Sequence, residues 1–131
     1  MFTYTWSRRA AVALAAVTTG AVTAGVAVAV ADNVRAPYAQ AGATVDSKGE
    51  IRSAKGVEEV RRLGPGEYCV VFTDPDFHPA RVLPSVSALQ RARIVNYTWA
   101  AGCGAAEHAA KVWTTDHSGA VADSWFSIVV H

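Results

Sequence analysis

Two cysteines and three of the tryptophans are the residues of this chain that could carry chemistry or binding. Cys69 and Cys103 are the only cysteines in the 131 residues, so one intramolecular pairing is open to them. Neither belongs to a Cys-x-x-Cys arrangement, which disfavours a metal site. We expect a disulfide whose loop of about 35 residues stabilises the fold by roughly 3 to 4 kcal/mol. Two free buried thiols are the alternative.

Trp99, Trp113 and Trp125 all fall in segments that we expect to be strands. Aromatic side chains gathered on one face of a sheet can hold a sugar or a partner protein. The competing interpretation is core packing, because a domain of about 90 residues needs large side chains to fill its interior. A ligand platform requires at least two of these indoles on the same exposed face.

The other polar residues predict neither a catalytic site nor a metal site. None of the four histidines has an acidic partner at the spacing of a known metal motif. The run Asp116-His117-Ser118 contains the residue types of a hydrolase triad, but consecutive residues in one turn cannot align as nucleophile, base and orienting group. Asp74 and Asp76 lack the ligand count of a calcium site. We therefore expect no enzymatic activity, no cofactor and no bound metal.

Residues 1–41 predict an export signal. A pair of arginines at positions 8 and 9 precedes residues 10–31, which carry no formal charge and consist almost wholly of Ala, Val, Thr and Gly. This is the layout of a signal peptide. Small-x-small cleavage sequences end at Ala31 and at Ala41. We favour cleavage after Ala41, because Pro37 would end the signal helix and leave an extended segment for the peptidase.

An uncleaved membrane anchor formed by residues 10–31 is the alternative. A helix of that length would be about 33 Å long and could cross a bilayer. Its alanines and glycines add little to insertion, so we expect membrane contact only through the signal before cleavage. The secreted product is then a single domain of residues 42–131. The oxidising setting outside the cytoplasm favours the disulfide.

The charge of the expected mature domain excludes one class of partner, nucleic acid, and indicates little about the others. Residues 42–131 contain nine Lys or Arg and ten Asp or Glu. They show no clustered cations of the kind that displace counterions from nucleic acid, so we expect no nucleic-acid partner. The abundance of Ala, Val, Gly and Arg is typical of a GC-rich genome and favours an actinobacterial source.

Short apolar segments between frequent turn residues predict an all-β fold, a small antiparallel β-sandwich of immunoglobulin-like size after the N-terminal signal helix. The clearest strand is residues 67–73, where aromatic and β-branched residues alternate. The turn Gly64-Pro65-Gly66 predicts that residues 57–63 pair with it through a bulge. A helix remains the alternative for residues 57–63, where Val57, Val60 and Leu63 fall three apart.

Further strands are expected nearer the C-terminus. Residues 93–99 should form a strand with Val95, Tyr97 and Trp99 on one face. Residues 110–115 and 125–130 are expected to form a second pair. Val45 and Ile51 flank a predicted first hairpin, and residues 74–81, which contain two prolines, are expected to form a loop. The strand count between residues 77 and 106 stays open.

Turn glycines and alternating apolar residues recur in both halves of the domain. The matching positions are Gly56-Val57, Val60, Arg62, Gly64, Gly66 and residues 67–72, then residues 111–115, the turn 116–119 and residues 122–130. This pattern resembles a recurrent secreted β-module of actinobacteria and is similar to C-terminal β-domains of phage tail fibres. The resemblance implies the fold but no catalytic residues. Cys69 and Cys103 match positions where members carry a cysteine after the strand tyrosine and another before the penultimate strand.

The function that these observations favour is that of a secreted, non-catalytic module with a structural, adhesive or ligand-binding role. Its partner would be a cell-surface glycan or a protein. A small secreted inhibitor or effector that acts on another protein is the alternative, with an exposed loop such as residues 74–81 as its contact. An enzyme is the third interpretation.

Overall fold

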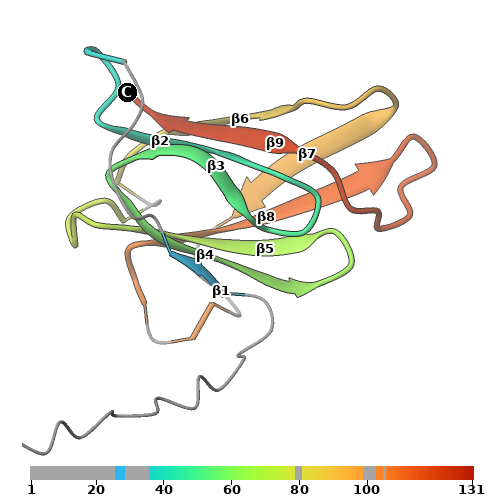
Figure 1. Ribbon diagram of the computed structural model, residues 1–131, viewed down its shortest axis with the longest axis horizontal. Helices are drawn as coiled ribbons and strands as arrows, with labels where there is room; N and C mark the ends of the chain where they lie inside the picture. Colours follow the sequence, from blue (N-terminus) through green and yellow to red (C-terminus); the bar gives the residue numbers. More distant parts are fainter. Residues whose placement is uncertain (1–25, 29–35, 79–80, 99–102, 105) are drawn as a thin grey trace, which may run out of the picture.

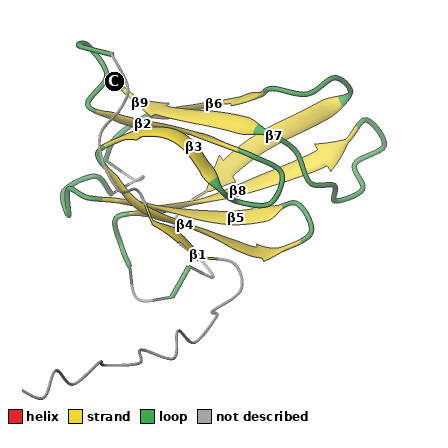
Figure 2. Ribbon diagram, in the orientation of Figure 1, coloured by secondary structure: helices red, strands yellow, loops and turns green. Residues whose placement is uncertain are grey.

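The described part of the chain is a sandwich of two antiparallel sheets. The computed structural model describes residues 26–28, 36–78, 81–98, 103–104 and 106–131. Figure 1 shows the two sheets as two layers, and the described residues form strands and loops only (Figure 2). The predicted all-β sandwich is therefore confirmed. The predicted signal helix lies outside the described residues, apart from residues 26–28, which form a short strand.

The first layer is a five-stranded sheet built around the predicted hairpin. Its order is β1-β4-β5-β8-β7, and β4 pairs with β5 through register irregularities next to Val57 and Arg62. The strand interpretation of residues 57–63 is therefore confirmed over the helical one. The strands are β1 (Val26–Val28), β4 (Val57–Gly64), β5 (Glu67–Phe72), β8 (Ala109–Asp116) and β7 (Arg93–Thr98).

The second layer is a four-stranded sheet with the order β3-β2-β9-β6. The predicted first hairpin supplies β2 and β3, and the C-terminal strand β9 lies between β2 and β6. Strand β6 fills part of the region in which the sequence left the strand count open. The bounds are β2 (Ala41–Val45), β3 (Ile51–Lys55), β6 (Pro84–Ala88) and β9 (Phe126–Val130).

The core lies between the two sheets and follows the alternation of the sequence. Along β9 the buried residues are Phe126, Ile128 and Val130, and the residues between them point outward. In β7, Val95 and Tyr97, which were predicted to share one face, both pack against the core. Period-two burial of this kind is what a sheet with one covered face requires.

The expected pairing of residues 110–115 with residues 125–130 is wrong. Strand β8 lies between β5 and β7, whereas β9 lies between β2 and β6 in the other sheet. Both strands bury one apolar face, so their side chains meet across the core instead of lying side by side in one sheet. The hydrophobic period alone does not say to which sheet a strand belongs.

The predicted disulfide between Cys69 and Cys103 is confirmed. The two sulfurs are 2.02 Å apart and the Cα atoms 5.6 Å apart. Cys69 lies on β5, and both cysteines are buried, with Val71 and Ala109, in a small cluster separate from the main core. The disulfide therefore fixes the segment that carries Cys103 against the outer face of the five-stranded sheet.

Replacing both cysteines, in the variant Cys69→Ala/Cys103→Ala, should lower the free energy of unfolding by about 4 kcal/mol, because the unfolded chain regains the entropy of an open loop. Urea denaturation of the variant and of the oxidised parent measures the difference. The parent treated with reductant is the control and should resemble the variant. A urea midpoint unchanged by the double substitution would contradict the expectation.

Gly66, in the turn between β4 and β5, is a backbone constraint on this layer. Its φ is +66°, and a Cβ at this position would collide with the carbonyl oxygen of Thr114 and the amide nitrogen of Ala122. Thr114 N also donates a hydrogen bond to Gly66 O at 2.8 Å. The turn therefore approaches the neighbouring backbone so closely that only glycine fits.

Gly66→Ala should destabilise the protein more than Gly119→Ala. Both positions have a positive φ, but nothing lies within 4 Å of a Cβ at Gly119. The left-handed conformation costs about 1 to 2 kcal/mol at either site, and the collision adds to this only at Gly66. Thermal denaturation of the two variants measures the difference. Equal losses would show that the close approach at Gly66 has no energetic weight.

Candidate functional site

The carboxylate of Asp123 organises the segment that leads into β9. Its Oδ1 accepts hydrogen bonds from Gly66 N at 2.8 Å and Arg62 Nε at 3.1 Å, and its Oδ2 accepts one from Arg62 Nη2 at 2.7 Å. The Tyr68 hydroxyl lies 3.1 Å from Oδ1 and 2.9 Å from the carbonyl oxygen of Ser47, and its single proton serves one acceptor at a time. Asp123 thus ties β4 and β5 of one sheet to the start of the other sheet's central strand.

These contacts shift the ionisation of the groups involved. Burial raises the pKa of the Asp123 carboxyl, but the hydrogen bonds from Arg62, Gly66 N and Tyr68 outweigh burial and hold this pKa below its usual value. Burial, followed by the negative charge of Asp123, raises the pKa of Tyr68 to about 12. At neutral pH the cluster therefore contains a carboxylate and a protonated phenol, which is the pairing that these hydrogen bonds need.

Asp123→Asn should lower the free energy of unfolding at pH 7 by about 1 to 3 kcal/mol, because hydrogen bonds to a charged acceptor are lost. The folded-state pKa lies below the ordinary value of 3.8, so the unfolded chain takes up this proton first as the pH falls. The stabilisation is therefore complete above that value and disappears as the pH falls through the folded-state pKa.

Urea denaturation at pH 7 and pH 3 measures this dependence. The difference in free energy of unfolding between the parent and Asp123→Asn should be smaller at pH 3 than at pH 7. A Glu107→Gln variant, altered on an exposed loop, is the control for general acid effects. A gap of the same size at both pH values would contradict the role given to the charged form of Asp123.

The structure places the two described candidate tryptophans on opposite outer faces of the sandwich. Trp113 lies between the buried residues Val112 and Thr114 on β8, so it points away from the core on the five-stranded side. Trp125 immediately precedes the buried Phe126 and points outward on the four-stranded side. Trp99 lies outside the described residues. Trp113 and Trp125 therefore do not form one shared platform.

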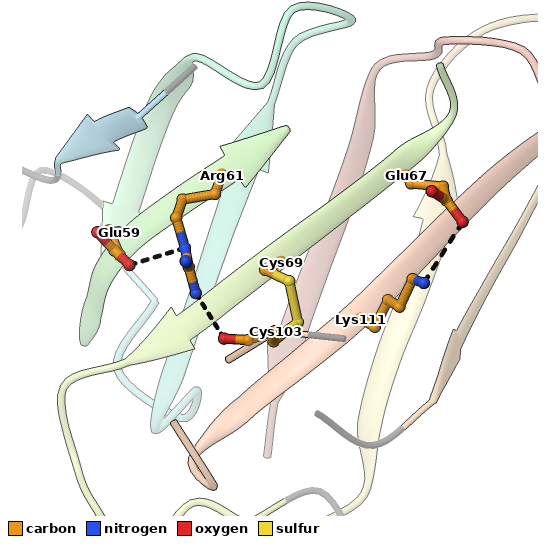
Figure 3. The surroundings of a disulfide bond; sticks show 6 residues. All are labelled: Glu59, Arg61, Glu67, Cys69, Cys103 and Lys111. Carbon is orange, nitrogen blue, oxygen red and sulfur yellow. Dashed lines mark hydrogen bonds and ion pairs between the residues drawn. A yellow bond between two sulfur atoms is a disulfide. The ribbon is translucent and has the colours of Figure 1, made fainter. Parts of the chain in front are cut away.

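The outer face of the five-stranded sheet is occupied by the disulfide and by ion pairs (Figure 3). Arg61 Nη2 donates to the carbonyl oxygen of Cys103 at 2.6 Å, and Arg61 Nε lies 3.0 Å from Glu59 Oε1. On the other side of the disulfide, Lys111 Nζ lies 3.4 Å from Glu67 Oε1. The same ammonium lies 5.5 Å from the centre of the Trp113 ring, so this indole is partly covered by a cation.

The outer face of the four-stranded sheet has a different character. One rung of the sheet carries a hydroxyl residue on every strand: Ser53 pairs with Thr44, Thr44 with Ser127 and Ser127 with Ser87. We refer to these four residues as the hydroxyl row. Since neighbouring strands lie about 4.8 Å apart, the row extends about 14 Å across the sheet. Each hydroxyl can donate one hydrogen bond and accept two.

A hollow of about 110 Å³ lies over this face, beside the hydroxyl row. Lys55 closes it by donating from Nζ to the carbonyl oxygens of Ala36 at 3.1 Å and Ala39 at 2.7 Å. The segment that contains these two alanines therefore forms one wall. The residues that line the hollow from the sheet include Gly42, Thr44, Ser53, Lys55, Ser127 and Val129.

Trp125 and Lys55 flank the hydroxyl row on opposite sides, because Trp125 comes two residues before Ser127 and Lys55 pairs with Gly42, two residues before Thr44. Its backbone N donates to Gln90 Oε1 at 3.2 Å, and the Arg52 guanidinium carbon lies 5.4 Å from the centre of its ring. Arg52 in turn forms ion pairs with Asp46 and Glu50. Trp125 is thus half-buried and lies beside the hydroxyl row, with its ring next to the Arg52 guanidinium.

Asp46 has the role at the β2–β3 turn that Asp123 has near β9. It is almost fully buried, and its carboxylate accepts hydrogen bonds from Glu50 N, Lys48 N and Arg52. Burial raises the pKa of Asp46, and these hydrogen bonds outweigh burial and hold that pKa below its usual value. The cation next to Trp125 is therefore paired at neutral pH.

The histidines and acids considered from the sequence lie on separate loops and strands. His108 Nε2 lies 3.9 Å from Glu58 Oε2, and Asp74 Oδ1 accepts a hydrogen bond from Asp76 N. Asp116 Oδ1 accepts from Ser118 Oγ at 2.6 Å and from Ser118 N at 2.8 Å, which closes a turn. Within the part of the chain that the structure describes, no three His, Cys, Asp or Glu residues gather where they could hold a metal ion.

Comparison with known proteins gives no relative for this chain. No family model, no curated protein and no solved structure matches it. Among the described residues, no helix is long and apolar enough to span a membrane.

Sequence reasoning missed the hydroxyl row and the Asp123 cluster. The sequence gives a weak indication of the row, because its serines and its threonine alternate with residues whose side chains point inward. The four strands are distant in the sequence, so only the pairing of the sheet brings their hydroxyl groups into one rung. No local sequence pattern indicates the role of Asp123, because its hydrogen-bond partners lie 55 to 61 residues earlier in the chain.

Proposed function

We propose that the chain is an exported, non-catalytic module that binds a neutral polysaccharide on the outer face of its four-stranded sheet. The hydroxyl row of Ser53, Thr44, Ser127 and Ser87 is the observation that carries this proposal. A row about 14 Å long can face two or three consecutive sugar units, and each hydroxyl can exchange hydrogen bonds with a sugar hydroxyl directly or through water.

The rest of the face supports the same kind of ligand. The hollow of about 110 Å³ beside the row makes this face concave, and ligand sites are generally concave. Trp125 adds an aromatic surface next to the polar row, and amphipathic aromatic residues of this type suit a sugar, whose ring has C–H groups on its faces and hydroxyls at its rim.

The charges around the face favour a neutral ligand. Lys55 Nζ donates to two backbone carbonyls, and Arg52 is paired with Asp46 and Glu50. An anionic polymer would have to compete with these partners for each cation. Neutral hydroxyl groups need only the donors and acceptors that the serines and the threonine supply.

The disulfide supports the expectation of export. Cys69 and Cys103 are both buried and bonded to each other, and disulfides persist in oxidising settings outside the cytoplasm. The expected signal segment and the resemblance to a secreted actinobacterial β-module support the same proposal. The module would then act at or beyond the cell surface. A polysaccharide is a ligand that such a module would meet there.

Trp125→Ala should weaken retention on a neutral polysaccharide about tenfold, which corresponds to about 1.4 kcal/mol. Ser127→Gln, which fills the middle of the hydroxyl row, should weaken it as well. The probes are cellulose, chitin and laminarin, with polygalacturonate as the charged comparison. Retention is measured by pull-down for the insoluble polymers and by affinity electrophoresis for the soluble ones.

Trp113→Ala is the matched control, because this indole is on the opposite sheet and also lies beside a cation. It should leave retention unchanged, and the melting temperature of each variant shows whether the fold is intact. The proposal fails if no neutral polysaccharide is retained by the parent, or if Trp113→Ala weakens retention as much as Trp125→Ala.

A further inference from the structure

We infer that the secreted chain keeps residues 36–41 and that its export signal is removed before this segment. The inference rests on the exported character proposed above. Ala41 is the first residue of β2, its side chain is fully buried, and it pairs with Val130. Cleavage after Ala41 would therefore start the mature protein inside a strand and would remove a core residue.

The residues just before β2 are also fastened to the sandwich. Gln40 N donates to the carbonyl oxygen of Val130 at 2.9 Å, and the Gln40 side chain donates to the carbonyl oxygen of His131 at 3.2 Å. Lys55 Nζ holds the carbonyl oxygens of Ala36 and Ala39. Loss of this segment would leave the ammonium of Lys55 without two acceptors and the hollow without one wall.

The positions of β1 and β2 in their sheets make a clear contrast. β2 lies between β3 and β9, and cleavage after Ala41 removes the pairing of Ala41 with Val130 of β9. β1 is an edge strand of three residues that pairs only with β4. Removal of β1 costs one short stretch of pairing at an edge, whereas truncation of β2 damages the interior of a sheet.

β4 has features of an edge strand, which suit its position in the sheet after β1 is removed. It carries the charged residues Glu58, Glu59, Arg61 and Arg62, and its pairing with β5 is irregular at both ends. Charged side chains and bulges are the features that keep an exposed edge from pairing with other chains. The fold therefore tolerates a cut between β1 and Ala36 better than a cut after Ala41.

Of the two cleavage sequences considered above, Ala29-Val30-Ala31 meets this condition. Cleavage there gives a secreted chain that begins with Asp32 and keeps the whole of β2. This reverses the preference for Ala41 that the position of Pro37 gave. It also predicts that β1 belongs to the precursor alone and that β4 becomes the edge of the sheet in the mature protein.

N-terminal sequencing and intact-mass measurement of the product, secreted by a bacterial host that expresses the full chain, test the inference. The expected product begins with Asp32. A product that begins with Gly42, or an uncleaved chain that begins with Met1, overturns it. Retention of the same product on neutral polysaccharide is measured separately. A product that begins with Gly42 and still binds would contradict this inference but not the proposed function.

Two matched substitutions locate the cut without depending on the stability of the product. Ala31→Leu places a large side chain at the last position of the favoured sequence and should abolish the processed form. Ala39→Leu places the same side chain within the other cleavage sequence and should leave the N-terminus at Asp32. The reverse pattern, with processing lost only in Ala39→Leu, would overturn the inference even if the wild-type product degrades.

Discussion

The hydrogen-bonded carboxylate of Asp123 is the interaction on which the arrangement of the two sheets depends. It accepts hydrogen bonds from a side chain of β4, from the turn before β5 and from the Tyr68 hydroxyl of β5. Trp125, two residues after Asp123, points outward, and β9 begins at the next residue, Phe126. Asp123 thus joins the chain just before β9 to β4 and β5 of the opposite sheet.

The two outer faces of the sandwich differ in their side chains. On the five-stranded side, the disulfide and the ion pairs of Arg61 and Lys111 fill the surface with contacts that hold the fold together. On the four-stranded side, Gly42 and the small hydroxyl residues leave the backbone accessible and form a hollow. The proposed ligand would therefore meet the face that carries the hydroxyl row and the hollow.

Sequence reasoning could predict the features that depend on local pattern and on elimination. The alternation in residues 67–73, the glycine turn before it and the single possible cysteine pairing gave the β5 strand, the β4–β5 hairpin and the disulfide. The assignment of β8 and β9 to different sheets could not be predicted, because both have the same inward-facing period. Strand β6 lies where the sequence left the strand count open, since Pro84-Ser85-Val86-Ser87-Ala88 contains only one large apolar residue.

The candidate site shows the same limit more strongly. Tryptophans are visible in a sequence, but whether Trp113 and Trp125 share a face depends on which sheet each strand joins. The hydroxyl row needs the register of three strand pairs at once, and the contacts of Asp123 reach back more than fifty residues. Chemistry assembled by sheet register therefore appears only in three dimensions, while chemistry carried by residue type alone appears in the sequence.

Chemical-shift mapping by NMR, with a soluble neutral β-glucan titrated into the isotope-labelled protein, tests whether the outer face of the four-stranded sheet binds a neutral glycan. We expect the largest amide shifts at Thr44, Ser87, Trp125 and Ser127, with little change at Lys111 and Trp113 on the opposite sheet. Shifts confined to the five-stranded sheet, or no shifts with any neutral glycan, would contradict it.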